Sequence, residues 1–290
     1  SSVSVGNTGS PVPAINATTN VSCNGGNNGA LDISVTGGTP LYTYVWSTSA
    51  LTQDISGLSA GTYTVTVTDA NFCVGTQSFV VTQPLVVGGT GVVTDVSCNG
   101  GADGSVNLSP TGGTPGYTYL WSNGFTSQDP TGLSAGTYTV TITDANNCTG
   151  TRSFSVTEPT AISVSTSSTP SGCLTGTGTA TASPSGGAGG YSYAWSSGAN
   201  TATALNLSSG LYTVTVTDQN GCTSVAQASV TTTNGPSISN SVVTNVTCNG
   251  GSDGGVNITV AGGTPGYTYA WSNSAATQDI SGVTAGLYTV

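Results

Sequence analysis

The chain repeats itself about every 75 residues, and this period constrains the fold more than any other feature. Cysteines recur at a spacing of 75 at Cys23, Cys98, Cys173 and Cys248. The four tryptophans keep nearly the same spacing, at Trp46, Trp121, Trp195 and Trp271. Stacked solenoid units are shorter, roughly 20 to 50 residues. Each repeat is therefore predicted to be a small domain with its own core.

The repeat predicts how the 290 residues divide. Residues 3–23 align without a gap on residues 228–248, so the chain is expected to open on the last strand of a preceding repeat. Val290 corresponds to Val140, so the fourth repeat is expected to be cut short and the sequence to be a window on a longer chain. The predicted segments are 1–11 (last strand of a preceding repeat), 12–84, 85–159 and 160–236 (complete repeats), and 237–290 (incomplete repeat).

Within a repeat the hydrophobic period is two. Tyr63, Val65 and Val67 alternate with threonines, as in an antiparallel strand with one buried face. No helical period occurs, and Gly-Gly-Thr-Pro segments mark turns. The fold class predicted is all-β, with tandem immunoglobulin-like or PKD-like β-sandwich domains of about 75 residues. In the second repeat, strands are expected near residues 85–97, 104–110, 116–122, 126–131, 136–144 and 150–157.

The seven cysteines favour disulfides over metal sites. Each of the first three repeats has a second cysteine 49 or 50 residues after the first, and six antiparallel strands would bring both to one end of the sandwich. A four-thiolate metal site would need close cysteine pairs, which the sequence lacks. An oxidising, extracellular location follows. The expected pairs are Cys23–Cys73, Cys98–Cys148 and Cys173–Cys222, with the partner of Cys248 beyond residue 290.

The composition excludes several classes of function. Charged residues make up 4% of the chain, which has one Arg, no Lys and no His, and carries a formal charge of −10. It therefore lacks an imidazole base or ligand and a Schiff-base amine. It also lacks the basic surface that nucleic acid or an anionic membrane requires. No apolar run approaches the roughly 20 residues of a membrane span. We expect no enzyme activity from these repeats and no membrane insertion.

Aromatic residues are the predicted core anchors, because no other large side chains recur in these Gly-, Ser- and Thr-rich repeats. The alternative is a stacking platform for sugars, which would make the repeats carbohydrate-binding modules. Exposure of the tryptophans separates the two, because a stalk should bury all four. The predicted core aromatics are Tyr44, Trp46, Tyr63, Tyr119, Trp121, Tyr138, Tyr193, Trp195, Tyr212 and Trp271.

Calcium is the one cofactor considered. Asp103 and Asp144 would be brought together by the expected Cys98–Cys148 bond, and their loops are rich in oxygen ligands. No twelve-residue calcium loop is present, however, and Asp is also an ordinary turn residue. We expect no metal or cofactor, and calcium stays open as the alternative.

The predicted surface suggests what the repeats contact. Rows of Thr and Ser lack the edge lysines that usually block strand association, so lateral or end-to-end self-association with copies of the same repeat is expected. Surface polysaccharides are a second candidate partner. Short linkers containing Pro84 or Pro159 leave little slack, which favours a semi-rigid rod.

Four motifs in combination resemble the SprB-type repeat of Bacteroidetes cell-surface adhesins. They are VSCNGGxxG, GGTPxYTYxWS, QDISGLSAGTYTVTVTDANxC and a closing SFxVTQP, and they cover nearly the whole chain, with the third repeat matching less well. The resemblance implies a very large secreted protein of the gliding-motility type, exported by the type IX system and displayed as surface filaments. The function expected is a structural stalk of repeats that resists force and proteolysis. One giant chain and a polymer of shorter chains stay open as alternatives.

Overall fold

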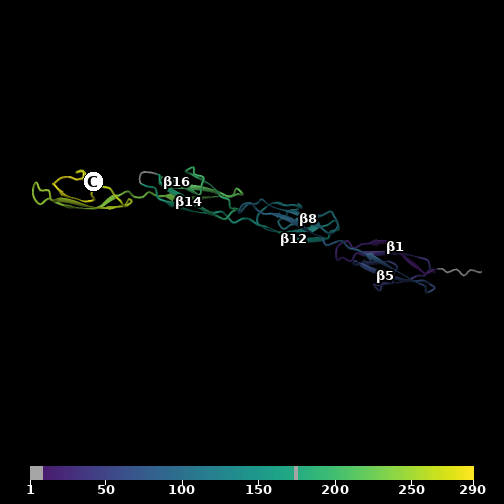
Figure 1. The fold of residues 1–290 in the computed structure, drawn as a ribbon. Helices are drawn as coiled ribbons and strands as arrows, with labels where there is room; N and C mark the ends of the chain where they lie inside the picture. The colour runs from purple at the N-terminus through teal and green to yellow at the C-terminus, as the bar shows by residue number, and fades with distance from the viewer. Residues whose placement is uncertain (1–8, 173–175) are drawn as a thin grey trace, which may run out of the picture. The chain divides into compact units, whose positions relative to one another are not determined.

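The computed structural model describes residues 9–172 and 176–290, and these residues form 21 strands and no helix (Figure 1). The chain divides into two compact units, Ser1–Glu158 and Pro159–Val290. The first contains the first two repeats, and the second contains the last two. The prediction of a tandem all-β fold is confirmed.

Each of the two repeats in the first unit has two three-stranded sheets. In the first repeat the sheets have the orders β1-β2-β4 and β3-β5-β6, and in the second they have the orders β7-β8-β10 and β9-β11-β12, all pairs being antiparallel. The first repeat contains β1 Val12–Thr19, β2 Gly29–Thr36, β3 Thr43–Trp46, β4 Ile55–Leu58, β5 Gly61–Thr68 and β6 Val74–Val81. The second contains β7 Gly88–Thr94, β8 Gly104–Thr111, β9 Thr118–Trp121, β10 Thr131–Leu133, β11 Gly136–Thr143 and β12 Thr149–Val156.

The second unit repeats this plan. Its sheets have the orders β13-β14-β16, β15-β17-β18 and β19-β20-β21. The strands are β13 Ser163–Thr169, β14 Gly178–Ser185, β15 Ser192–Trp195, β16 Thr203–Leu207, β17 Gly210–Thr217, β18 Thr223–Val230, β19 Ser237–Thr244, β20 Gly254–Ala261 and β21 Ile280–Val283.

The two sheets of a repeat enclose one apolar core. In the second repeat Leu108 of β8, Trp121 of β9 and Val140 of β11 are all almost completely buried in the same cluster. The Trp121 ring lies 5.9 Å from that of Phe154 on β12, measured between centroids. The outward residues of β11 are threonines, as the period of two predicts.

A glycine lets the sheets approach at one edge. Gly150 lies on β12, and a Cβ built there would sit 1.9 Å from the backbone oxygen of Val87, just before β7. Gly75 of the first repeat has the same environment, 1.8 Å from the oxygen of Pro11. Any side chain at these positions would separate β12 from β7, or β6 from the start of β1.

The predicted strand over residues 126–131 is wrong, because side chains there replace a backbone ladder. Gln128 Nε2 donates to the Leu108 oxygen at 2.6 Å, and the Leu108 nitrogen donates to Asp129 Oδ1 at 2.8 Å. This Gln-Asp pair satisfies both backbone groups of Leu108, and β10 starts only at Thr131. The third repeat has no such pair; there the Ala182 nitrogen donates to the Ala202 oxygen at 2.9 Å.

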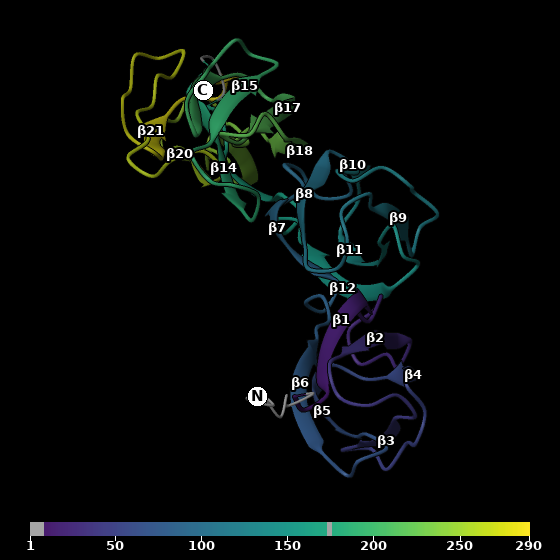
Figure 2. The ribbon, with the colours of Figure 1, turned by 90° about the vertical axis from the view of Figure 1, so that its right-hand side faces the viewer.

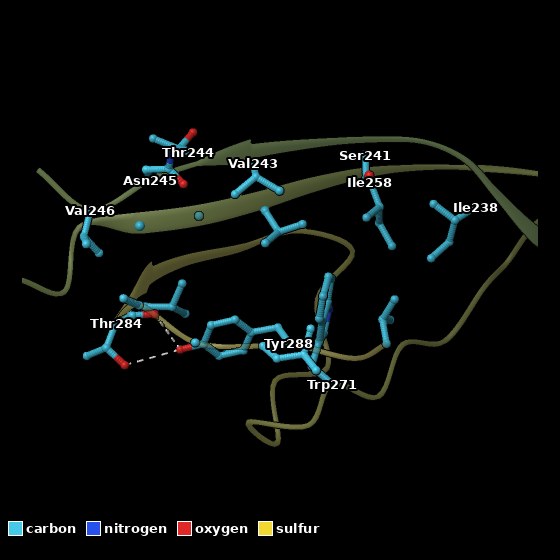
Figure 3. Close-up of a pocket in the computed structure, with 18 residues that line it drawn as sticks. Ile238, Ser241, Val243, Thr244, Asn245, Val246, Ile258, Trp271, Thr284 and Tyr288 are labelled. Atoms are coloured by element: carbon cyan, nitrogen blue, oxygen red, sulfur yellow. Dashed lines mark hydrogen bonds between the residues drawn. The ribbon is translucent and has the colours of Figure 1, made fainter.

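The core of the fourth repeat is open to a pocket. A pocket of about 580 Å³ lies between β19, β20 and the segment that carries Trp271 and Tyr288 (Figure 3). In the second repeat the corresponding space beside Gly104 is taken by Val156 of β12. In the described residues of the fourth repeat, β19-β20-β21 is the sheet formed, and no strand takes that place. The repeat boundaries given above stay a prediction.

Candidate functional site

The junction between the first and second repeats brings together three segments that the sequence separates widely. They are the loop of residues 22–28 after β1, the linker of residues 82–87 after β6, and the turn of residues 144–148 between β11 and β12. In Figure 2 the end of β1 adjoins the part of the second repeat that carries β12. We call these three segments the junction site.

A disulfide joins the two repeats at this site. Cys23 of the first repeat is bonded to Cys148 of the second, with their Cα atoms 5.5 Å apart and a sequence separation of 125. Cys148 is buried, whereas Cys73 is a free thiol. The predicted pairs Cys23–Cys73 and Cys98–Cys148 are therefore wrong, because the bond links neighbouring repeats and does not close one repeat on itself.

The course of the strands explains this correction. Strands β1 and β6 run in the same direction, because the Val21 nitrogen just after β1 donates to the Thr82 oxygen just after β6, and Gly75 at the start of β6 approaches the Pro11 oxygen just before β1. Strand β4 is antiparallel to β2, as β1 is, and β3 is antiparallel to β5, as β6 is, so β3 and β4 run in the same direction. The connection between them brings the chain back along the sandwich without a strand, so counting six alternating strands gives the wrong end. Strand β6 then separates Cys73 from the end where the Val21 nitrogen donates to the Thr82 oxygen. Its eight residues span about 25 Å, far beyond the roughly 7 Å that a disulfide allows between Cα atoms.

The other cysteines complete the picture. Cys98 and Cys222 are both disulfide-bonded. The predicted pair Cys173–Cys222 involves Cys173, which lies outside the described residues. Cys248 is a free, exposed thiol in the described part of the chain.

Hydrogen bonds hold the Cys23 loop against the linker. The Gly26 nitrogen donates to the Cys23 oxygen at 3.0 Å, which closes the loop on itself. The Gly25 nitrogen donates to Gln83 Oε1 at 2.7 Å, and Asn24 Nδ2 donates to the Pro84 oxygen at 3.0 Å. The loop therefore fixes the point where the chain leaves the repeat, and it aims Cys23 at the next repeat.

The Cys148 turn is organised by one carboxylate. Asp144, which is buried, accepts hydrogen bonds from the backbone nitrogens of Thr114, Asn146 and Cys148 at 2.8, 2.9 and 2.8 Å. Burial alone would raise the pKa of Asp144, but these three donors stabilise the charged form and leave its pKa below the usual value. This carboxylate is a structural centre that fixes Cys148 for its bond.

The repeats also touch through polar atoms and enclose a small space. Asn146 Nδ2 of the second repeat donates to the Ser22 oxygen of the first at 3.3 Å. A cavity of about 330 Å³ is lined by residues of both repeats, among them Cys23, Pro84, Asn147 and Cys148. The junction is thus a contact with a defined geometry as well as a covalent link.

The two carboxylates considered for calcium have separate roles. Asp103 Oδ1 accepts the Ser97 nitrogen at 3.0 Å, and its other oxygen accepts from the Ser97 hydroxyl. Both oxygens of Asp144 accept backbone nitrogens, and the bond expected to bring the two residues together is not formed. Among the described residues no three Cys, Asp or Glu side chains gather as metal ligands. The calcium alternative stays untested.

The tryptophans lie inside the repeats. Trp46, Trp121, Trp195 and Trp271 are 2 to 6% exposed, so none presents a face for stacking on a sugar. Each indole nitrogen donates to a backbone oxygen six residues further on, at 2.9 to 3.0 Å. The other predicted core aromatics are half-buried beside these clusters: Tyr44, Tyr63, Tyr119, Tyr138, Tyr193 and Tyr212.

Four stretches of the chain match a known protein family. The family model for the SprB repeat matches residues 15–51, 90–126, 165–200 and 240–276, about half of the chain. The chain belongs to the SprB repeat family. Each match starts within the first strand of a repeat and extends past its tryptophan, so it includes the first cysteine of that repeat. No curated protein matches this SprB-repeat chain.

Solved structures with similar folds are tandem immunoglobulin domains. The SprB-repeat chain is 11% identical to Sidekick-1 immunoglobulin domains 1–5, with a TM-score of 0.35, covering 76% of this chain and 58% of that one. It is 10% identical to the eight N-terminal Ig domains of the Down syndrome cell adhesion molecule, with a TM-score of 0.28, covering 90% of this chain and 52% of that one.

A residue that the sequence pattern did not point to caps the cysteine loop. Gln83 accepts from Gly25, and one period later Glu158 Oε2 accepts from the Gly100 nitrogen at 2.6 Å. The signal was a Gln or Glu before the linker proline in both repeats. Only the fold shows that it binds a loop almost 60 residues away.

Proposed function

We propose that this SprB-repeat chain is a segment of an extracellular, adhesin-like stalk whose repeats are joined in series by disulfides. The observation that carries the proposal is the Cys23–Cys148 bond, which crosses from one repeat to the next. Tension along the chain then has two covalent routes past the linker, the backbone and the disulfide. The residues between the two cysteines are sheltered from extension even if a repeat unfolds.

Other features support a passive structural role. The tryptophans are core residues, and the buried carboxylates Asp69, Asp144 and Asp218 each accept three backbone nitrogens. Within the described parts of the chain, no helix is long and apolar enough to cross a membrane. Because the repeats resemble those of gliding-motility-type adhesins, we also propose that the stalk is displayed on a bacterial cell surface.

Single-molecule stretching between the two chain ends tests this function. If the bond crosses repeats, reduction of the stretched chain releases at least one step of about 410 to 450 Å, because the separation of 125 residues is freed at 3.3 to 3.6 Å each. Bonds within single repeats would release no step larger than about 180 Å for some 50 residues. Steps of only the smaller size would overturn the proposal.

Lateral contact with copies of the same repeat and binding of surface polysaccharides belong to the same proposal. Exposed Thr and Ser rows on the outward faces support the first, for example Thr62 and Ser78 on β5 and β6. Sedimentation of the chain alone, and with soluble polysaccharides, tests both. A monomer that is unchanged at high concentration and with each polysaccharide would remove them.

A further inference from the structure

Two cysteines in the described residues are free, and both stand at positions that are bonded elsewhere in the chain. Cys73 occupies the position of Cys148 in the repeat, and Cys248 occupies the position of Cys23. From this we infer that Cys73 and Cys248 are the two halves of a further inter-repeat disulfide, and that each is completed by another SprB repeat, such as one in a second copy of this chain. The inference deepens the proposed function, since it names the partner of these surfaces.

The Cys73 turn is already built for such a bond. Asp69 accepts hydrogen bonds from the nitrogens of Thr39, Asn71 and Cys73 at 2.8, 2.9 and 2.8 Å, which are the distances seen around Asp144. Asn71 Nδ2 donates to Thr39 Oγ1 at 2.7 Å, as Asn146 donates to Thr114 Oγ1 at 2.9 Å. The turn therefore reproduces the bonded turn without its neighbour.

The Cys248 loop matches the other half. The Gly251 nitrogen donates to the Cys248 oxygen at 2.9 Å, as Gly26 does to Cys23 at 3.0 Å. Asp253 Oδ1 accepts the Thr247 nitrogen at 3.0 Å, as Asn28 Oδ1 accepts the Ser22 nitrogen at 3.0 Å. Cys248 is exposed, so its thiol is accessible to a partner.

Exposed apolar side chains beside Cys73 are independent evidence for a covering partner. Phe72 is 86% exposed and has a φ of 64°, a left-handed conformation that is costly for a bulky residue. Its counterpart Asn147 lines the cavity shared with the first repeat. Leu41 in the neighbouring turn is 84% exposed. A preceding repeat docked as in the junction site would meet this apolar surface next to the thiol.

The bond forms by thiol–disulfide exchange with a low-molecular-mass disulfide such as glutathione disulfide. The Cys248 thiolate attacks one sulfur of glutathione disulfide and displaces one glutathione thiolate. The Cys73 thiolate of the other copy then attacks the Cys248 sulfur of the mixed disulfide and displaces the second glutathione. One disulfide is reduced and one is formed, so electrons and atoms balance.

Two complementary variants test the inference with the whole chain. Cys73→Ser keeps only the Cys248 half, and Cys248→Ser keeps only the Cys73 half. With glutathione disulfide present, the mixture is expected to give a species of twice the 28.3 kDa of one chain on a non-reducing gel. Each variant alone should form it at least about tenfold more slowly, because docking raises the effective concentration of the correct pair only. The unsubstituted chain should give a ladder of multiples.

The linked peptide identifies the bond. Mass spectrometry of the mixed species should find Cys73 joined to Cys248, and denaturant should abolish the preference for the mixture. Equal dimer formation by each variant alone, or no dimer in the mixture, would overturn the inference while leaving the stretching result for Cys23–Cys148 intact. In cellular material, the reduced mass then separates a second subunit from a repeat on the same polypeptide as the source of the partner.

Discussion

The turns that end in Cys73 and Cys148 have the same internal hydrogen bonds but different surroundings. Asp69 and Asp144 hold them with equal distances, yet Cys148 is buried in a disulfide and Cys73 is a half-exposed thiol. The difference teaches that the turn is formed by its own repeat, and that the neighbouring repeat adds only the bond and the cover. The junction site is therefore preorganised before two repeats meet.

The largest expected effect comes from breaking the bond. Cys23→Ser should lower the free energy of unfolding by about 5 kcal/mol on the chain-entropy model, because the loop it opens has a sequence separation of 125. Alkylation followed by mass spectrometry should find a new thiol at Cys148. The matched control Cys73→Ser should leave stability and the labelling of Cys148 unchanged. A new thiol at Cys73 in place of Cys148 would contradict the pairing.

Next in size is the loss of the carboxylate that organises each turn. Asp144→Asn and Asp69→Asn should each lower the melting temperature by several degrees, since an amide cannot accept all three backbone donors as well. The effect should be larger for Asp144, because its turn also positions a disulfide. Thermal unfolding followed by circular dichroism measures both, and an equal effect on both turns would remove the proposed contribution of the bond.

The same carboxylates make stability depend on pH. For Asp69 the Thr39 nitrogen is the main cause of the lowered pKa, with burial opposing it and the Cys73 and Asn71 nitrogens adding to it. A pKa lowered in the folded state contributes stability above the unfolded value of about 3.8, and that stability is lost as pH falls through the folded pKa. The melting temperature should therefore decrease as the pH is lowered through about 4, and it should decrease less steeply in Asp69→Asn. Equal slopes would refute this.

A smaller effect is expected when Phe72 of the first repeat is replaced by Asn, the residue at the corresponding position 147 of the second repeat. Phe72→Asn should stabilise the isolated chain by about 1 kcal/mol, because Asn accepts the left-handed conformation that Phe72 adopts at a φ of 64°. Urea unfolding measures the gain. The same substitution should slow pairing with Cys248 of another copy if Phe72 is covered in the dimer. If the chain is stabilised but pairs at an unchanged rate, the substitution relieves backbone strain and Phe72 is not covered in the dimer.

The smallest effect concerns the hydrogen bond across the junction. Asn146→Ala loses its bond to the Ser22 oxygen in addition to the one within its turn, whereas Asn71→Ala loses only the bond within its turn. The first variant should be less stable than the second by about 0.5 to 1 kcal/mol. Urea unfolding of the two variants in parallel gives the difference directly. Equal stabilities would show that the 3.3 Å contact contributes nothing.

Much of the fold could be predicted, because local patterns specify it. The alternation of Tyr63, Val65 and Val67 gave β5 its buried face, and Val65 and Val67 are fully buried. The strand expected over 126–131 failed because Gln128 and Asp129 use their side chains as a substitute ladder, and alternation in a sequence does not reveal this.

The junction site could be predicted only in part. The separation of 125 residues between Cys23 and Cys148 is not a multiple of the 75-residue period. The nearly equal spacing of the two cysteines within each repeat suggested Cys23–Cys73 instead. The direction of β3 and β4 decided the pairing, since it puts Cys73 and Cys23 at opposite ends of one sandwich. The role of Gln83 was invisible for the same reason, because its partner Gly25 is remote in sequence.

The sequence by itself determined the repeat, the all-β fold, the buried tryptophans and a set of side chains with one Arg, no Lys and no His. These properties follow from the local sequence pattern and from the residue types present, which do not depend on how distant parts of the chain meet. The tertiary structure alone decided which cysteines meet, and that the Cys23 loop and the Cys148 turn position them for the bond. The reason is geometric, since a disulfide depends on which ends of two domains come within a few ångströms, and that depends on strand direction over the whole repeat.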